Sequence, residues 1–172
     1  MASLMENLIT VLREESSQYG QLLELSMKKT PVIVAGDLES LQHITDEEQD
    51  IVAKLNRLDT KRAEVTKDIA NVLNRDVATL KLADIIDMLG QRPVEQKQLA
   101  EAHDELKLVV EQMARVNRQN QDLIQQSLEM VEFDLNLIHS LRSAPQTANY
   151  NKGAYAAGTM IGTKAGTFDA KQ

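Results

Sequence analysis

The sequence contains no cysteine and no tryptophan, and only three tyrosines and two phenylalanines among its 172 residues. Without cysteine, disulfides, thiolate metal sites and cysteine nucleophiles are excluded, and folding does not need an oxidising compartment. Seven glycines and three prolines are roughly half of the usual combined share of about 12%. So few turn-forming residues disfavour a turn-rich β fold and predict an all-α protein.

Long apolar runs and an excess of positive charge are also missing. The segment Met1–Leu12 has no basic start, and Glu6 interrupts its apolar residues, so it does not resemble a secretory signal. No run approaches the ~18 apolar residues of a membrane span. Nineteen basic against 26 acidic residues give a net charge of −7, which opposes affinity for nucleic acid or anionic lipid. We predict a cytoplasmic protein with protein partners, no nucleic acid and no direct membrane insertion.

A long heptad pattern follows Asp37. Its positions alternate by steps of three and four residues, as in the seam of a coiled coil or bundle: Leu41, Ile44, Glu48, Ile51, Leu55, Leu58, Arg62, Val65, Ile69 and Val72. Asp37 can cap the first turn. Thr45 is an alternative start with capping-box spacing, but the pattern passes through it in phase. We therefore predict one helix over 38–74.

Three more helices are predicted around this one. A second long seam after Pro93 predicts a helix over 94–142, and the apolar face of 82–89 predicts a short helix that Gly90 closes in the left-handed conformation. A first helix is expected over 3–28, ended or kinked by Pro31. The predicted fold is an elongated antiparallel helical bundle or coiled coil over residues 1–142.

The segment 143–172 has a different composition. Ser, Thr, Asn, Gly and Ala dominate it, and the apolar residues lose their period. Its charges are three lysines against Asp169, so it is weakly basic while the rest of the chain is acidic. We expect a flexible, disordered C-terminal tail.

The sequence shows no pattern of a catalytic or metal site. A di-iron bundle requires Glu-x-x-His, but the residues three before His43, His103 and His139 are Ser40, Ala100 and Asn136. Phosphotransfer domains usually have a basic residue and a small residue one turn after the phosphorylated histidine, and this pair is absent after His103. No phosphate-binding glycine loop, Gly-x-Ser-x-Gly or His-Glu-x-x-His motif occurs. We predict no enzyme activity, no cofactor and no metal.

The last predicted helix carries more apolar surface than one seam requires. Two stripes run one position apart between 123 and 141, and the second stripe either packs inside the bundle or receives an amphipathic helix. The candidate binding residues are Leu123, Ile124, Leu128, Val131, Leu135 and Ile138. Asn117 and Asn120 interrupt the apolar pattern just before them, as amides that fix register or take part in binding.

The order of several motifs resembles the FlgN family of flagellar export chaperones. These motifs are ITDEE at 44–48, then Leu55, Leu58, Lys61 and Arg62, VNRQNQDLI at 116–124 and YNKG at 150–153. The resemblance covers most of the chain, although each heptad motif alone recurs widely. The segment after Gly153 is longer than the family leads us to expect, and no role is inferred for it.

The resemblance implies a cytosolic chaperone. Members of the family bind the C-terminal helical ends of hook–filament junction proteins, also called hook-associated proteins, keep them unassembled and deliver them to the export gate. A tyrosine shortly before glycine in the tail is associated with the gate, and this implies gate docking by Tyr150. The alternative class is a structural coiled-coil homodimer or scaffold, in which the second stripe is a dimer interface.

Overall fold

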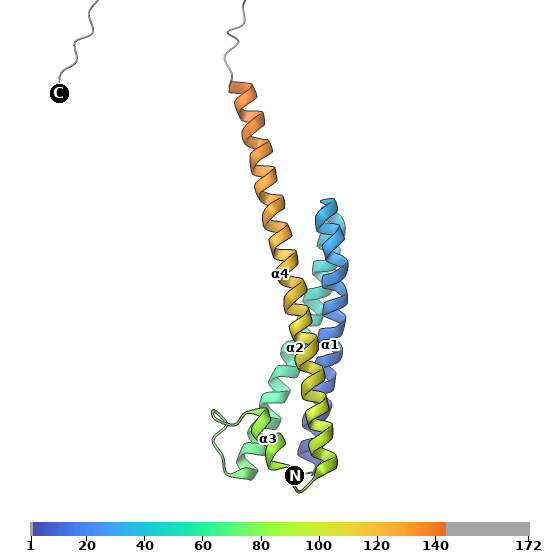
Figure 1. Cartoon of the computed structure of the whole chain (residues 1–172), viewed down its shortest axis with the longest axis vertical. Coiled ribbons are helices and arrows are strands. Elements are labelled where there is room, and N and C mark those ends of the chain that lie inside the picture. The colour runs from blue at the N-terminus through green and yellow to red at the C-terminus, as the bar shows by residue number, and fades with distance from the viewer. Residues whose placement is uncertain (1, 144–172) are drawn as a thin grey trace, which may run out of the picture. The chain divides into compact units, whose positions relative to one another are not determined.

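The structure, a computed structural model, describes residues 2–143, and they form four helices. The helices are α1 (Ala2–Ala35), α2 (Leu38–Leu73), α3 (Leu82–Met88) and α4 (Pro93–Ser143) (Figure 1). No strand occurs within residues 2–143. The all-α prediction is therefore confirmed, and the predicted tail lies outside the described residues.

A two-residue turn joins α1 to α2. Gly36 has a φ of 67°, a left-handed conformation that glycine adopts without a Cβ clash. Asp37 then caps α2, because its carboxylate accepts a hydrogen bond of 3.0 Å from the Ser40 backbone N–H. The start predicted from Asp37 is confirmed, whereas Thr45 lies inside α2 and donates its hydroxyl to the Leu41 carbonyl. The tight turn returns α2 alongside α1.

Two predicted helix ends differ from the structure. Helix α1 continues through Pro31 to Ala35, because one proline removes only one backbone donor. Ile33 in the last turn of α1 is buried and holds this turn against the rest of the first helices. Gly90 does not adopt the left-handed conformation after α3. Instead, the Arg92 N–H donates to the Leu89 carbonyl at 2.7 Å, and this tight turn leads directly into Pro93, a favoured first residue of a helix.

The chain divides into two units, with the boundary between Phe133 and Asp134 inside α4. The core of the first unit has one cluster to which all four helices contribute, and a smaller one formed by α1 and α2. The larger cluster contains Met5, Leu8, Ile9, Leu12, Val65, Ile69, Ile85, Leu89, Leu99, Ala102 and Leu106. The smaller one contains Leu22, Leu25, Ile51 and Leu55. Only the larger cluster includes residues from α3.

These clusters give the helix directions within the first unit. The start of α1 packs with the end of α2, and the middle of α1 packs with the middle of α2, so the two helices are antiparallel. The start of α4 shares the cluster of Met5, and further along Asn117 contacts Ser26 of α1. In the first unit α4 therefore runs parallel to α1 and antiparallel to α2, as predicted for the two long seams.

Candidate functional site

A layer of polar side chains crosses from α1 to α4 above the smaller apolar cluster. Thr30 Oγ1 lies 2.6 Å from Asn120 Oδ1, and Asn120 Nδ2 donates to the Ser26 carbonyl at 2.7 Å. Ser26 Oγ also donates to Asn117 Oδ1 at 2.9 Å. Asn120 is 3% exposed, so its amide is paired where water hardly reaches it. Asn117 is exposed, so the two amides lie in different surroundings, and their role in register or in binding stays a prediction.

The same layer extends to α2. Lys29 forms an ion pair with Glu48, and both side chains are largely buried. Glu48 occupies a seam position of α2, and Ser26 Oγ lies 3.4 Å from its Oε1. The layer therefore joins all three long helices of the first unit. It defines one level at which the relative register of these helices is fixed.

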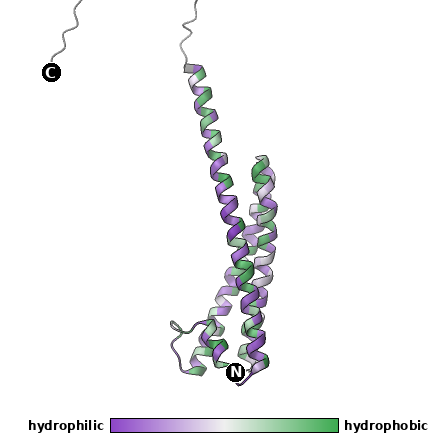
Figure 2. Ribbon diagram, viewed as in Figure 1, coloured by the Kyte–Doolittle hydropathy of each residue, from purple (hydrophilic) through white to green (hydrophobic). Residues whose placement is uncertain are grey.

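Beyond this layer, the apolar residues of α4 lose their cover. Asn120 is the last buried residue of α4 in the first unit. Leu128 is 59% exposed and Val131 is 55% exposed. The hairpin end of α1 and α2 is also coloured hydrophobic in Figure 2, and there Leu38 is 77% exposed. The part of α4 beyond the polar layer and the hairpin end of α1 and α2 thus both present apolar side chains to solvent.

These two surfaces form the walls of an apolar groove of about 290 Å³. We call it the hairpin groove. It is lined by Val32, Ile33, Gly36, Leu38, Leu41, Ile124, Ser127, Leu128 and Val131. Three candidate residues of α4 are thereby brought together with the tip of the α1–α2 hairpin. An apolar groove of this kind can receive the apolar face of a helix.

The other predicted binding residues lie elsewhere. Leu123 is half-buried and does not line the groove. Leu135 and Ile138 belong to the second unit, where they are 51% and 46% exposed. Sequence reasoning missed the hairpin wall, although the apolar run at 32–34 beside Pro31 was a signal for it. Tyr150 lies outside the described residues.

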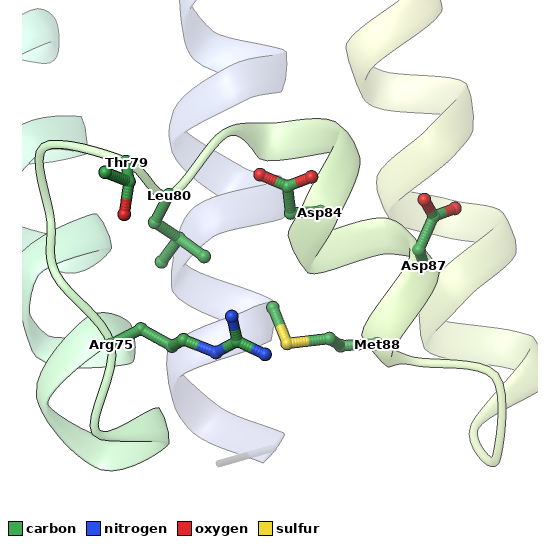
Figure 3. Close-up of a pocket in the computed structure, with 6 residues that line it drawn as sticks. All are labelled: Arg75, Thr79, Leu80, Asp84, Asp87 and Met88. Atoms are coloured by element: carbon green, nitrogen blue, oxygen red, sulfur yellow. The ribbon is translucent and has the colours of Figure 1, made fainter.

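A second hollow of about 260 Å³ lies between the α2–α3 loop and α3. Figure 3 shows the Arg75 and Met88 side chains extending toward each other, while the carboxylates of Asp84 and Asp87 point away from the guanidinium. Thr79 and Leu80 complete the lining. These side chains do not converge as a nucleophile with a base, so the hollow offers no argument for catalysis.

Within residues 2–143, no three His, Cys, Asp or Glu side chains converge on a point that could hold a metal ion. His43 Nδ1 lies 2.9 Å from Glu47, and His103 Nδ1 lies 3.0 Å from Asp104. None of the described helices combines the length and apolar character that crossing a bilayer requires.

A buried carboxyl group pairs with a seam arginine between α1 and α2. The Glu15 side chain is 3% exposed, and its Oε2 lies 3.3 Å from Arg62 Nη1. Burial raises the pKa of Glu15 above its ordinary value of 4.5, the Arg62 guanidinium opposes this rise, and Asp59 adds to it. Arg62 also forms an ion pair with Asp59. Arg62 therefore compensates a charge that is costly to bury.

We expect Arg62→Leu to lower the free energy of unfolding at neutral pH by about 1–3 kcal/mol, because it leaves the Glu15 carboxylate unpaired and Arg62 is only partly buried. Burial raises the pKa of Glu15 and Arg62 lowers it, so Arg62→Leu lets this pKa rise further, and protonation of the carboxyl then removes the unpaired buried charge. The loss should therefore shrink as the pH falls toward about 5. Urea unfolding at both pH values measures this. Adding Glu15→Gln should restore most of the stability, whereas an equal loss at both pH values would contradict the pairing.

Comparison with protein families and known proteins gave one match. A family model described as FlgN protein matches residues 1–157, a range that includes the hairpin groove. Searches of curated proteins and of solved structures found no match. The matched range covers most of the chain and agrees with the order of motifs in the sequence.

Proposed function

The chain belongs to the FlgN family of flagellar chaperones, and we propose that it binds the C-terminal helical segments of hook-associated proteins. In this proposal it acts in the cytoplasm, prevents premature assembly of its clients and delivers them to the cytoplasmic domain of the export gate. The hairpin groove is the proposed binding site. Leu135 and Ile138 are proposed to contact the same clients.

The observation that carries this proposal is the apolar groove between the hairpin tip and α4. Leu38, Leu128 and Val131 are each more than half exposed, yet they lie around one hollow. Exposed apolar surface of this kind is characteristic of binding sites. A client helix would cover it and would be shielded from assembly in return.

The architecture of the first unit favours a helix as the occupant. At the end that holds the larger cluster, Ile85 of α3 and Leu89, which follows α3 directly, lie in one cluster with residues of the other three helices. At the hairpin end no described helix takes the corresponding place. A client helix would complete a four-helix arrangement there, with its apolar face turned inward.

Complex formation with a hook-associated protein tests this function. Light scattering after gel filtration should show a monomer alone and a stoichiometric complex with the client. A dimer whose mass does not change with concentration, and which binds no client, would instead support the structural homodimer or scaffold. The exposed apolar residues of α4 would then form the dimer interface.

Tyr150 is proposed to dock the loaded chaperone on the export gate. A tyrosine offers a large apolar ring with a polar tip and has few rotors to immobilise. We expect Tyr150→Ala to leave folding and client binding unchanged, but to weaken capture of the client-loaded chaperone by the gate's cytoplasmic domain and to reduce export. A pull-down with the purified gate domain measures the capture.

Tyr155 provides the matched control for this experiment, since it lies five residues further along the chain. Tyr155→Ala should behave like the parent. Equal recovery of the parent and both variants would remove Tyr150 from the mechanism. Loss with Tyr155→Ala alone would assign the docking to that residue instead.

A further inference from the structure

We infer that Asn120 and Thr30 are positioning residues, which set the spacing between the two walls of the hairpin groove and keep the groove open for a client. This inference rests on the proposed function, in which the groove receives a client helix. It adds the residues that hold the α4 wall relative to the α1–α2 wall. The evidence is the geometry of this pair, its place beside the groove and the exposed apolar surface of both walls.

The pair joins α4 to α1 through two directional hydrogen bonds. The Thr30 hydroxyl donates to Asn120 Oδ1 at 2.6 Å, and Asn120 Nδ2 donates to the Ser26 carbonyl at 2.7 Å. Asn120 is 3% exposed, so water can hardly replace these partners. A displacement of α4 along α1, or a rotation of α4 about its own axis, would therefore leave buried polar atoms unpaired, at a cost that apolar contacts do not impose.

The pair lies directly beside the groove. On α1, Thr30 precedes the lining residue Ile33 by three positions, and on α4 Asn120 precedes the lining residue Ile124 by about one helical turn. No residue of α4 in the range 121–133 is buried. The hydrogen bonds of Asn120 are thus the last buried contact that holds α4 before it becomes a wall of the groove.

Both walls would bury apolar surface by closing on each other. Leu38 of the hairpin is 77% exposed and Leu128 of α4 is 59% exposed, although both line the same hollow. Burial of such surface is favourable, and apolar contacts do not prescribe one relative position of two helices because they have no direction. A polar residue in a helix seam restricts the helices to one register at some loss of stability. Asn120 and Thr30 supply this restriction, and the groove stays open.

The double variant Asn120→Leu with Thr30→Val tests this inference in the full chain. It replaces both partners by apolar side chains of similar shape, which is often neutral or stabilising. We expect the urea midpoint to stay equal to that of the parent or to rise, while binding of a purified hook-associated protein weakens at least about tenfold in titration calorimetry. A lower urea midpoint with unchanged client affinity would assign the pair a role in stability alone, and would overturn the inference.

A distance across the groove reports on the walls without a client. Because the chain contains no cysteine, Glu39→Cys and Gln126→Cys together carry spin labels at two defined positions. Both residues are exposed, and neither lines the groove. Pulsed electron paramagnetic resonance should give a shorter mean distance in the double variant than in the parent labelled at the same positions. An unchanged distance would overturn the inference.

Single variants assign the effect to the bond between the helices. Thr30→Ser keeps a hydroxyl that can donate to Asn120 and Thr30→Val does not, so only Thr30→Val should shorten the distance and weaken client binding. Thr45→Val is the matched control. Thr45 is also half-buried, but its hydroxyl donates within its own helix, to the Leu41 carbonyl at 2.8 Å. Equal effects of Thr30→Val and Thr45→Val would contradict a specific role of the pair.

The distance without a client separates this inference from the proposed function. If the double variant shortens the distance but the parent binds no hook-associated protein, the proposed function fails and the positioning of the walls is upheld. If the parent binds the client and the double variant changes neither distance nor affinity, only the inference fails. If the distance shortens and the client still binds with the affinity of the parent, client binding does not depend on the spacing of the walls, and the inference is overturned.

Discussion

Val131→Asp is expected to weaken binding of a hook-associated client by about 2–4 kcal/mol, or roughly 30- to 700-fold in the dissociation constant. Val131 lines the hairpin groove, so a client that covers it would bury the new carboxylate against an apolar surface. In the free chaperone Val131 is 55% exposed, and the charge would remain hydrated. Titration calorimetry with the purified client measures the loss.

Val72→Asp is the matched control, because Val72 has the same exposed fraction of 55% and does not line the groove. We expect both variants to keep the unfolding free energy of the parent within about 0.5 kcal/mol, as is usual at exposed positions. Unfolding of Val131→Asp would assign its stripe to a core. Normal client binding by a folded Val131→Asp would place the client site elsewhere.

Ile85→Ala should lower the free energy of unfolding by about 2–5 kcal/mol, the range for deleting a buried branched side chain. Ile85 is 1% exposed, and its cluster includes residues of all four helices. The short helix α3 has only seven residues, so its position depends on this contact more than on its own helix propensity. Urea unfolding gives the free energy, and an unchanged denaturant slope indicates that the unfolded ensemble is unaltered.

Met88→Ala provides the comparison within α3. Met88 is 41% exposed, so its truncation should reduce stability by less than about 1 kcal/mol. A similar, small loss in Ile85→Ala and Met88→Ala would show that α3 is not part of the cooperative core. A large loss confined to Ile85→Ala would establish α3 as the fourth wall at this end of the first unit.

Local patterns were sufficient to predict most of the helices. The seam of α2 repeats along one face over ten positions, and Asp37 caps the helix at the expected residue. The same kind of pattern predicted α4 and its antiparallel direction relative to α2. Such signals are local because helical periodicity and capping depend on residues within one or two turns of each other.

The features that the sequence did not predict depend on contacts distant in the chain. Pro31 lies in a helix that extends to Ala35, where buried Ile33 holds the turn. Gly90 was expected to be left-handed, but the turn it occupies leads straight into α4. The hairpin wall of the groove lies about ninety residues before the α4 wall, so the spacing within either helix alone could not pair Leu38 with Leu128.

Photocrosslinking from single positions tests most directly whether the hairpin groove holds the client helix. A photoreactive residue replaces Leu128, which is 59% exposed in the groove, or Leu108, which is 57% exposed on α4 before the polar layer. We expect position 128 to crosslink to the C-terminal helical segment of a hook-associated protein, and position 108 to give no such product. Equal crosslinking from both positions, or crosslinking from position 108 alone, would contradict client binding in the groove.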